Sequence, residues 1–412
     1  MCRLCSSTSL HRGCRYATKY PLPRRADPGG SRPLSPLRHR DFRLVLASTT
    51  LLFSGYALLL SVVPLWVVHR GSGEFAAGAA TGVFMGATVA AQCVVPVLAA
   101  RFGYRLVTAA GGLLLGLPAP LLLLTTDWPG ILGVSLVRGL GFGLVSVCGS
   151  ALIGELLPAS SAARGSGWYG LATGVPQLLG LAIGTWAAGT WGFTPVFLIA
   201  TALPLAGVLP VLLLPKLLPE DSGLEVRWSV VTTRTWRPGL VLFSGAVGFG
   251  AMATFVPLVL NGPAAAVSAT LFVATGAALL GRWSAGLFAH RVRGSGRMLG
   301  VATVVVGVGM AVFAVTAPVG GAWALTAAIA GGAVFGAGFG VVQNDALVVM
   351  FARVSPGAAG VVWNLAFDAG QGAGAVLVGA MLAGLGPVGA FGVLAGFALV
   401  LLPVGRAARV TG

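Results

Sequence analysis

Long apolar runs separated by short polar segments repeat along almost the whole chain. Each run has about 20 residues or more, the length that an α-helix needs to cross the hydrocarbon core of a bilayer. Strand-like alternation is absent from the runs, and helices are the structure that satisfies every backbone group of an open-ended segment within a bilayer. The pattern predicts twelve transmembrane helices, over residues 43–68, 76–100, 105–125, 129–156, 165–189, 194–214, 238–260, 265–289, 297–317, 322–350, 357–383 and 387–405.

The composition leads to the same class of protein. Hydrophobic residues make up 56% of the 412 residues and charged residues 9%, too few to cover a water-soluble globule of this size. The net charge of +16 does not indicate a nucleic-acid partner, because no basic face with interleaved aromatic residues is present. We therefore expect an all-α integral membrane protein whose surroundings are a lipid bilayer.

Basic residues are distributed unevenly between the two sides of the predicted helices. Of the 26 Lys and Arg residues, 23 lie before the first run or in the segments that follow even-numbered runs. The segments on the other side contain only Arg70, while Arg138 and Arg282 lie inside runs. The positive-inside rule then predicts a multi-pass protein of the cell membrane with both termini in the cytoplasm.

The first 36 residues differ from the rest of the chain. They are basic and rich in Ser, Pro and Gly, and they lack the apolar core of a signal peptide, so we expect a disordered tail. Cys2, Cys5, His11 and Cys14 are residue types that can bind zinc, but their spacing matches no common zinc motif. We predict no metal site and no cofactor.

The chain contains an internal repeat. The segment "RGLGFGLV" at 138–145 recurs as "FGAGFGVV" at 335–342, and two further pairs of segments recur in the same order. The shared glycines are expected to let neighbouring helices pack closely. The repeat predicts four parts, a tail (1–36), an N-terminal six-helix bundle (37–214), a cytoplasmic linker (215–237) and a C-terminal six-helix bundle (238–412). Duplicated membrane chains commonly place the substrate path between the repeats, near the bilayer midplane.

Three ionisable residues lie deep inside the apolar runs, Arg138 in the first half and Asp345 and Asp368 in the second. Such groups are functional candidates by default, because each needs a partner or water within the membrane. We regard all three as candidates for proton coupling, with Arg138 as a counter-charge to either acid. The alternative is structural, with an arginine held by neighbouring carbonyls and acids held in fixed hydrogen bonds.

Polar and aromatic residues near these groups are candidates for the wall of a substrate cavity. Asn364 and Gln371 share a helical face with Asp368, at spacings of four and three residues. Tyr169, Thr173 and Gln177 share another face, which fits a packing surface equally well. The full set of cavity candidates is Gln343, Asn344, Asn364, Gln371, Trp363, Tyr169, Thr173 and Gln177.

A second set of candidates lies toward the predicted cytoplasmic ends of the helices. Arg282 fits either a gate or an anchor whose long side chain reaches the interface. The cytoplasmic gate candidates are Arg101, Gly103, Arg105, Glu155, Arg282 and Arg291.

From about residue 36 onward, the chain resembles the major facilitator superfamily. The segments "SPLRHRDFRLVLAS", "ARFGYRL", "RGLGFG" and "GLATGVPQLLGLAIG" stand where that family has its motifs. The family's aspartate in the loop after the second helix is Ala100 here, and His290 takes its place in the second half. The resemblance implies the major facilitator fold, with twelve helices in two pseudo-symmetric bundles that move solutes by alternating access. Within the family, the chain is most similar to bacterial twelve-span drug and metabolite exporters.

These observations together predict a secondary active transporter that acts as a monomer. We expect it to export a small, partly hydrophobic molecule in exchange for protons. A proton-coupled importer and a non-transporting membrane receptor or scaffold are the alternatives. An enzyme is not expected, because the sequence offers no phosphate loop, metal-ligand set or nucleophile–base pair.

Overall fold

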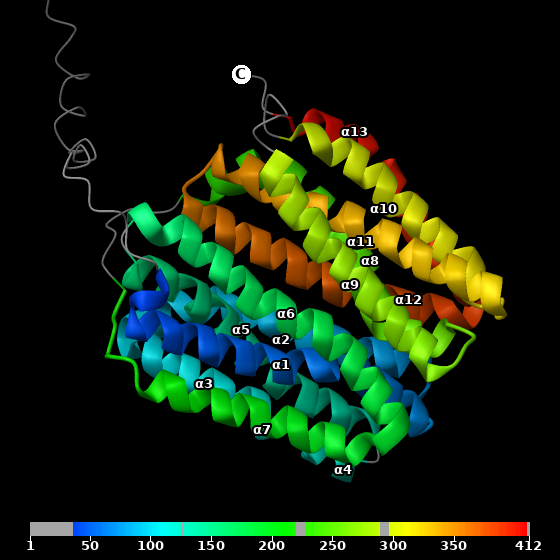
Figure 1. Cartoon of the computed structure of the whole chain (residues 1–412), viewed down its shortest axis with the longest axis horizontal. Coiled ribbons are helices and arrows are strands. Elements are labelled where there is room, and N and C mark those ends of the chain that lie inside the picture. The colour runs from blue at the N-terminus through cyan, green and yellow to red at the C-terminus, as the bar shows by residue number, and fades with distance from the viewer. Residues whose placement is uncertain (1–35, 126, 158, 220–226, 289–295, 410–412) are drawn as a thin grey trace, which may run out of the picture. The chain divides into compact units, whose positions relative to one another are not determined.

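The computed structural model describes residues 36–409 except positions 126, 158, 220–226 and 289–295. The chain divides into two units, Met1–Ser35 and Pro36–Gly412, and every described helix lies in the second (Figure 1). Pro36 begins a short 3-10 helix, η1 (Pro36–Arg38). The rest of the predicted tail, with its cysteines and His11, lies outside the described residues.

Long helices dominate the second unit. They form because the apolar runs contain few residues that need water, and a helix satisfies the backbone groups of its own segment within a bilayer, so that the runs stay helical despite their many glycines and several prolines. The helices are α1 (Arg40–His69), α2 (Gly73–Phe102), α3 (Tyr104–Gly116), α4 (Leu121–Leu124), α5 (Trp128–Leu156), α6 (Ala159–Trp191), α7 (Phe193–Leu212), α8 (Trp228–Val259), α9 (Ala264–Phe288), α10 (Arg297–Thr316), α11 (Ala322–Phe351), α12 (Pro356–Val400) and α13 (Leu402–Ala407).

Eleven segments of the described chain are long and apolar enough to cross a membrane, one fewer than predicted. The difference lies in α12, whose 45 residues would extend about 68 Å as a straight helix, more than twice the hydrocarbon thickness of about 30 Å. At Gly386 the backbone leaves the helical region, with φ of 63° and ψ of 178°, and Pro387 follows. We therefore count α12 as two passages that meet at Gly386, close to the predicted break between 383 and 387.

One predicted boundary differs from the observed helix. The linker was expected to extend to residue 237, but α8 begins at Trp228. Residues 228–237, "WSVVTTRTWR", are too polar to belong to a predicted spanning run, yet they continue the helix beyond its apolar part. Hydropathy therefore locates the part of α8 that can be buried in lipid and underestimates the length of the helix.

The helices pack as two groups with equivalent internal contacts (Figure 1). In the first group, α5 packs on α2 and α3, while α1 packs on α6 and α7. In the second group, α11 packs on α9 and α10, while α12 packs on α8 and α10. We call these groups the N-terminal bundle and the C-terminal bundle. They contact each other mainly through α2 with α12 and through α6 with α9.

The repeated glycines fulfil the same packing function in both bundles. A Cβ atom added to Gly141 of α5 would lie 2.6 Å from the carbonyl oxygen of Gly111 in α3. At the repeat-equivalent position of α11, a Cβ on Gly338 would lie 2.9 Å from the backbone nitrogen of Val306 in α10. Both separations are too short for a side chain. The structure thus confirms the predicted close packing around the shared glycines.

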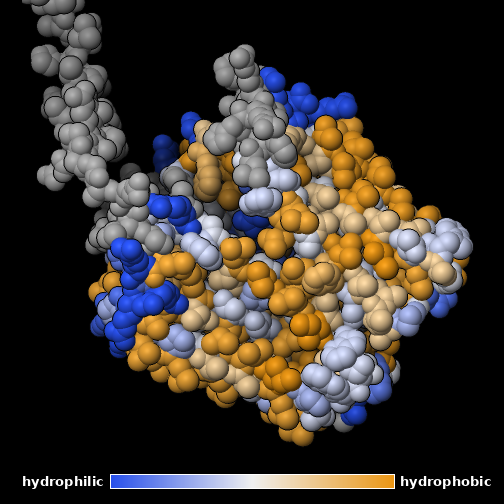
Figure 2. Space-filling view, in the orientation of Figure 1, coloured by the Kyte–Doolittle hydropathy of each residue, from blue (hydrophilic) through white to orange (hydrophobic). Residues whose placement is uncertain are grey.

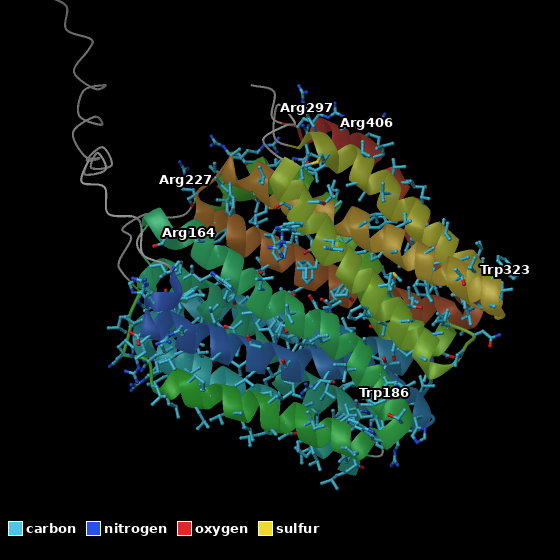
Figure 3. All side chains as sticks on the ribbon, in the orientation of Figure 1. Arg164, Trp186, Arg227, Arg297, Trp323 and Arg406 are labelled. Atoms are coloured by element: carbon cyan, nitrogen blue, oxygen red, sulfur yellow. The ribbon has the colours of Figure 1, made fainter. Side chains whose placement is uncertain are left out.

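Four arginines and two tryptophans lie toward opposite ends of the bundles (Figure 3). Arg164, Arg227, Arg297 and Arg406 lie toward one end of the bundles, which we call the basic end, whereas Trp186 and Trp323 lie toward the opposite end (Figure 3). Between these ends, the visible surface is largely hydrophobic (Figure 2). This distribution fits a protein whose middle section lies in hydrocarbon and whose ends reach the interfaces.

Candidate functional site

Asp368 lies in the middle of the protein, where the two bundles meet. It is 12 residues from the start of α12, about 18 Å along the helix, and only 6% of its surface is exposed. Its Oδ2 accepts a hydrogen bond of 2.6 Å from Nε2 of Gln92 in α2. A carboxyl group of the C-terminal bundle is therefore bonded directly to an amide of the N-terminal bundle.

Gln92 connects Asp368 to a longer series of polar groups in the N-terminal bundle. Its Nε2 also donates to Oγ of Ser146 in α5, at 3.3 Å. The hydroxyl of Tyr169 in α6 donates to the backbone carbonyl of Ser146, again at 3.3 Å. The buried Oε1 of Gln92 has no partner among the described residues. The amide of Gln92 therefore retains an unused acceptor beside a carboxyl group.

Gln371 forms a second hydrogen bond between the bundles. Its Nε2 donates to the hydroxyl oxygen of Tyr56 in α1 at 3.0 Å, while its own buried Oε1 has no partner among the described residues. Asp368 and Gln371 thus share a face of α12 that contacts the N-terminal bundle, as their spacing predicts. Asn364, the third residue of that predicted face, is half-buried.

Asp345 has different surroundings. Its Oδ1 accepts from the backbone N–H of Gly296 at 3.2 Å, and its Oδ2 accepts from those of Met298 and Leu299 at 3.1 and 3.0 Å. These N–H groups belong to the start of α10, where helix geometry leaves donors unpaired and the helix dipole attracts a negative charge. The arrangement favours a structural function for Asp345, which is 4% exposed.

Four of the remaining candidates gather in one region of the C-terminal bundle. The guanidinium carbon of Arg282 in α9 lies 5.2 Å from the centre of the Trp363 ring. Nε1 of Trp363 donates to the backbone carbonyl of Gln343 at 3.0 Å, and the ring stacks on that of Phe367 at 5.2 Å. Asn344 is half-buried on the same helix as Gln343. A cation, two stacked aromatic rings and a backbone carbonyl are thus brought together.

Tyr169, Thr173 and Gln177 lie on α6, the helix of the N-terminal bundle that packs on α9 of the C-terminal bundle. Tyr169 contacts α5 through Ser146, as described above. The hydroxyl of Thr173 bonds only to carbonyls of its own helix, those of Tyr169 and Gly170. Gln177 is half-buried one turn further along. Of these three, Tyr169 is the one that the structure joins to Asp368 through a series of hydrogen bonds.

Arg138 contacts neither of the two acids in the described part of the chain. Its Nε donates to the carbonyl of Leu115 in α3 at 3.1 Å, and its guanidinium carbon lies 5.6 Å from the centre of the Phe84 ring. Arg138 is 3% exposed, and its Nη2 has no partner among the described residues. The structure does not bring about the predicted pairing of Arg138 with Asp345 or Asp368.

The gate candidates Arg101, Arg105 and Glu155 lie toward the basic end, and each has a partner other than the remaining two. Oε1 of Glu155 accepts from the hydroxyl of Tyr104 at 3.3 Å, and Arg105 donates to the carbonyl of Leu214 at 3.2 Å. The guanidinium of Arg101 lies over the ring of its neighbour Phe102. Gly103 has a φ of 80°, which glycine adopts readily, and joins α2 to α3. Arg291 lies outside the described residues.

Three residues of this hydrogen-bonded region, Tyr56, Gln92 and Ser146, are absent from the candidates that the sequence offers. Tyr56 lies in the middle of an apolar run and away from the membrane interfaces where tyrosines usually gather. Gln92 is the sole glutamine of its run. Tyr56 and Gln92 therefore stand at unusual positions for their residue types, and this is the feature of the sequence that could have identified them as candidates. Their partners are hundreds of residues away, so the contacts themselves could not be predicted.

Comparison with known proteins agrees with this arrangement. The family model described as "Major Facilitator Superfamily" matches residues 45–362. The crystal structure of a D-xylose-proton symporter is similar with a TM-score of 0.72 and 14% identity, over 88% of this chain and 96% of that one. The nucleoside transporter NupG (TM-score 0.69, 14% identity) is similar over 89% of this chain and 98% of its own.

A transporter of the POT family, crystallised with a thioalcohol-conjugated peptide, is similar with a TM-score of 0.68 and 13% identity, over 89% of this chain and 95% of that one. At these identities the likeness shows the fold alone, whereas the family match spans most of the chain. The chain belongs to the Major Facilitator Superfamily, and it is a multi-pass membrane transporter rather than an enzyme.

Proposed function

We propose that this protein exports a small, partly hydrophobic molecule in exchange for protons, with Asp368 as the residue that carries the proton. The observation that supports this most strongly is the hydrogen bond between Asp368 and Gln92 across the two bundles. A proton that binds or leaves at this carboxyl group changes a contact on which the packing of the bundles depends. Coupling between protons and alternating access requires such a link.

Gln92 suits this function because an amide is both a donor and an acceptor. Its Nε2 can donate to an ionised Asp368. After the side-chain amide rotates to exchange its nitrogen and oxygen, its free Oε1 can accept from a protonated Asp368. The carboxyl group then has a partner in both states. Burial still favours the neutral form, because an ionised carboxylate away from water is costly unless it is fully paired. Protonation therefore favours the conformation in which Asp368 is buried between the bundles.

The hydrogen bonds between the bundles support a conformation in which the two bundles are packed together at the end opposite the basic end. They join Gln92 with Asp368, Tyr56 with Gln371, Thr81 with Thr254, and Thr185 with Ser268. The bond between Thr185 and Ser268 lies far along α6 from its basic end. Toward the basic end, residues 361–367 of α12 are all half-buried, so no face of this stretch is completely packed. We propose that the substrate enters or leaves on this side.

We propose that the substrate binds between the Trp363 region and the face of α6 that carries Tyr169. Trp363 and Phe367 offer stacked aromatic surfaces, while Asn344 and Asn364 offer amide groups. Mostly apolar walls with a few polar groups are typical of small-molecule sites. This composition supports a partly hydrophobic substrate. The position of Arg282 against Trp363 supports a function in this wall rather than as an anchor at the membrane interface.

Two resemblances bear on the direction of transport, and they support opposite directions. The sequence motifs resemble those of bacterial exporters, and this supports export. Import by proton symport is the second candidate, supported by the similar fold of a D-xylose-proton symporter. In either case, we propose that the basic end faces the cytoplasm, because 23 of the 26 Lys and Arg residues belong to that side in the predicted topology. Because both bundles belong to one chain, we propose that a monomer is sufficient.

The proposal can be tested with purified protein in lipid vesicles that contain a pH-sensitive dye. A pH gradient is imposed, and sugars, nucleosides and partly hydrophobic antibiotics are added one at a time. We expect a subset of the partly hydrophobic compounds to move together with protons, and to stop moving in Asp368→Asn while Asp345→Asn retains coupled movement. If neither protons nor any compound move in the unaltered protein, the proposal is wrong.

A deletion strain distinguishes the two directions. Loss of an exporter should make cells more sensitive to some members of an antibiotic panel, whereas loss of an importer should slow growth on a limiting nutrient. Plasmid-borne protein should restore the normal phenotype, and the Asp368→Asn protein should not. Slower growth on a single nutrient without any change in antibiotic sensitivity would contradict export.

A further inference from the structure

Arg138 lines a small cavity inside the N-terminal bundle, which we call the arginine cavity. Helices α1, α2 and α5 surround it, and no carboxylate is among its lining residues. Its volume of about 20 Å³ is sufficient for one species of the size of a water molecule. Its polar lining residues are Tyr56, Thr81, Ser135 and Arg138, and the other lining residues, Phe84 among them, are apolar.

The charge of Arg138 is poorly compensated in this place. A guanidinium has five N–H donors and no acceptor. One donor is bonded to the carbonyl of Leu115, and the buried Nη2 has no partner among the described residues. The face of the Phe84 ring attracts a cation, but a neutral ring offsets only part of a full buried charge. A positive charge with unused donors thus faces a cavity that lacks a negative group.

The hydroxyl groups of the same cavity are also placed to donate. The oxygen of Tyr56 accepts from Gln371, so its own hydrogen is left for another partner. In the same way, the oxygen of Thr81 accepts from Thr254. Ser135 is buried, and its hydroxyl makes no hydrogen bond to any described residue. Donors from three helices therefore converge on a space that apolar side chains otherwise line.

We propose that the arginine cavity binds a small monovalent anion of the size of chloride. Such an ion would accept from the guanidinium of Arg138 and from the hydroxyls of Tyr56 and Ser135, and it would neutralise the buried charge. A neutral water molecule could accept two of these hydrogen bonds but would leave the charge uncompensated. A cation is excluded by the charge of Arg138, and a large organic anion is excluded by the volume of the cavity.

The proposed site is linked to the interface between the bundles. The hydrogen of the Tyr56 hydroxyl is free for the anion because Gln371 of the C-terminal bundle occupies the oxygen. When α12 moves away from α1, this constraint is lost and the hydroxyl can turn. The anion therefore binds more tightly when the two bundles are packed together, and its binding stabilises that conformation.

The test compares thermal unfolding of the purified full-length protein in sodium chloride and in sodium gluconate of equal ionic strength. A ligand that binds the folded state raises the unfolding temperature as its concentration increases. We expect chloride to raise this temperature in a saturable way, and bromide to act similarly. Arg138→Gln should lower the apparent affinity by about tenfold or more, as expected when a charged hydrogen-bonding partner is lost.

Two further variants keep Arg138 in place and guard against a failure of Arg138→Gln to fold. Ser135→Ala removes a single donor, and Gln371→Leu removes the partner of Tyr56 without touching the cavity. Each should lower the apparent chloride affinity by about fivefold, the equivalent of one neutral hydrogen bond. The matched control is Arg101→Gln, because the guanidinium of Arg101 lies over Phe102 at the basic end. Its chloride response should remain normal.

Three results would overturn the proposal. The first is an equal unfolding temperature in chloride and gluconate, which would show that the cavity holds water. The second is a normal response in all of Arg138→Gln, Ser135→Ala and Gln371→Leu. The third is an equal loss of response in Arg101→Gln, which would assign the effect to arginines at the surface.

Discussion

Asp345 and Asp368 are both buried carboxyl groups of the C-terminal bundle, yet their partners are of opposite kinds. Asp345 accepts three hydrogen bonds from backbone N–H groups at the start of α10, within its own bundle. Asp368 accepts one from the amide of Gln92, which belongs to the other bundle. In the proposed rearrangement of the bundles, the partners of Asp345 would move with it, whereas the partner of Asp368 would not.

We propose that this difference separates a structural acid, Asp345, from a coupling acid, Asp368. Backbone N–H groups can only donate, so they stabilise the ionised form of Asp345 and give a proton no compensating partner. The amide of Gln92 can serve either form of Asp368. An intramembrane acid is thus best judged by whether its partners can accommodate both protonation states, and whether they belong to the part of the protein that moves.

The largest effect is expected for Asp368→Asn. The amide keeps the size and an acceptor oxygen for Gln92 but cannot carry a proton, so coupled transport should be abolished. The protein should still fold, with an unfolding temperature within a few degrees of the unaltered protein. Vesicle transport and thermal unfolding measure the two quantities. If coupled transport persists at the normal rate, the assignment of Asp368 is wrong.

Asp345→Ala should affect stability instead. It leaves three N–H groups at the start of α10 without their acceptor, and we expect the free energy of unfolding to fall by about 3 kcal/mol. Asp345→Asn retains an acceptor and loses only the charge, so its loss should be about 1 kcal/mol. Chemical or thermal unfolding compares the two variants.

The number of protons moved per substrate molecule is the control measurement for the Asp345 variants. It should be unchanged in Asp345→Asn, because the proton-carrying group is intact. A changed ratio with normal stability would reverse the roles of the two acids.

Gln92→Leu should have the smallest effect. It removes one hydrogen bond between the bundles, worth about 1 kcal/mol, so the ratio of molecules closed to molecules open at the end opposite the basic end should fall about fivefold. Closure can be followed with cysteines at Gly189 and Ala264, since a Cβ on Gly189 would lie 3.4 Å from that of Ala264. This separation is close to the range found in disulfides.

Thr173→Val is the matched control for Gln92→Leu. The hydroxyl of Thr173 bonds only within α6, so the rate of disulfide formation between residues 189 and 264 should stay normal. An equal decrease in both variants would show that the rate reports general loosening of the helices instead of the contact between Asp368 and Gln92.

The helices could be predicted from the sequence because the length of an apolar run and the thickness of a bilayer together determine where a spanning helix can lie. The prediction of 129–156 matches α5 (Trp128–Leu156) closely. The predicted bounds differ from the structure where polar residues continue a helix beyond its apolar run, as at the start of α8. The repeat of the glycines also predicted equivalent packing in both halves, because close helix contact needs small residues wherever it occurs.

The site could be predicted only in part, since sequence shows which residues are unusual but not what they contact. Asp345 and Asp368 look alike in the sequence, as single acids in apolar runs. Gly296, just before α10, lies 49 positions from Asp345, and Gln92 lies 276 positions from Asp368. Arg138 was expected to pair with an acid because opposite charges attract, but packing places it against Leu115 and Phe84.

The central claim is that the proton on Asp368 controls the packing of the two bundles. Its most direct test is the pH dependence of cross-linking between cysteines at positions 189 and 264, with the native cysteines replaced. Because burial favours the protonated form of Asp368, raising the pH should slow cross-linking relative to the Asp368→Asn protein, which mimics the protonated state. The Asp345→Asn protein should follow the unaltered one. If the Asp368→Asn protein shows the same pH dependence as the unaltered protein, the claim is contradicted.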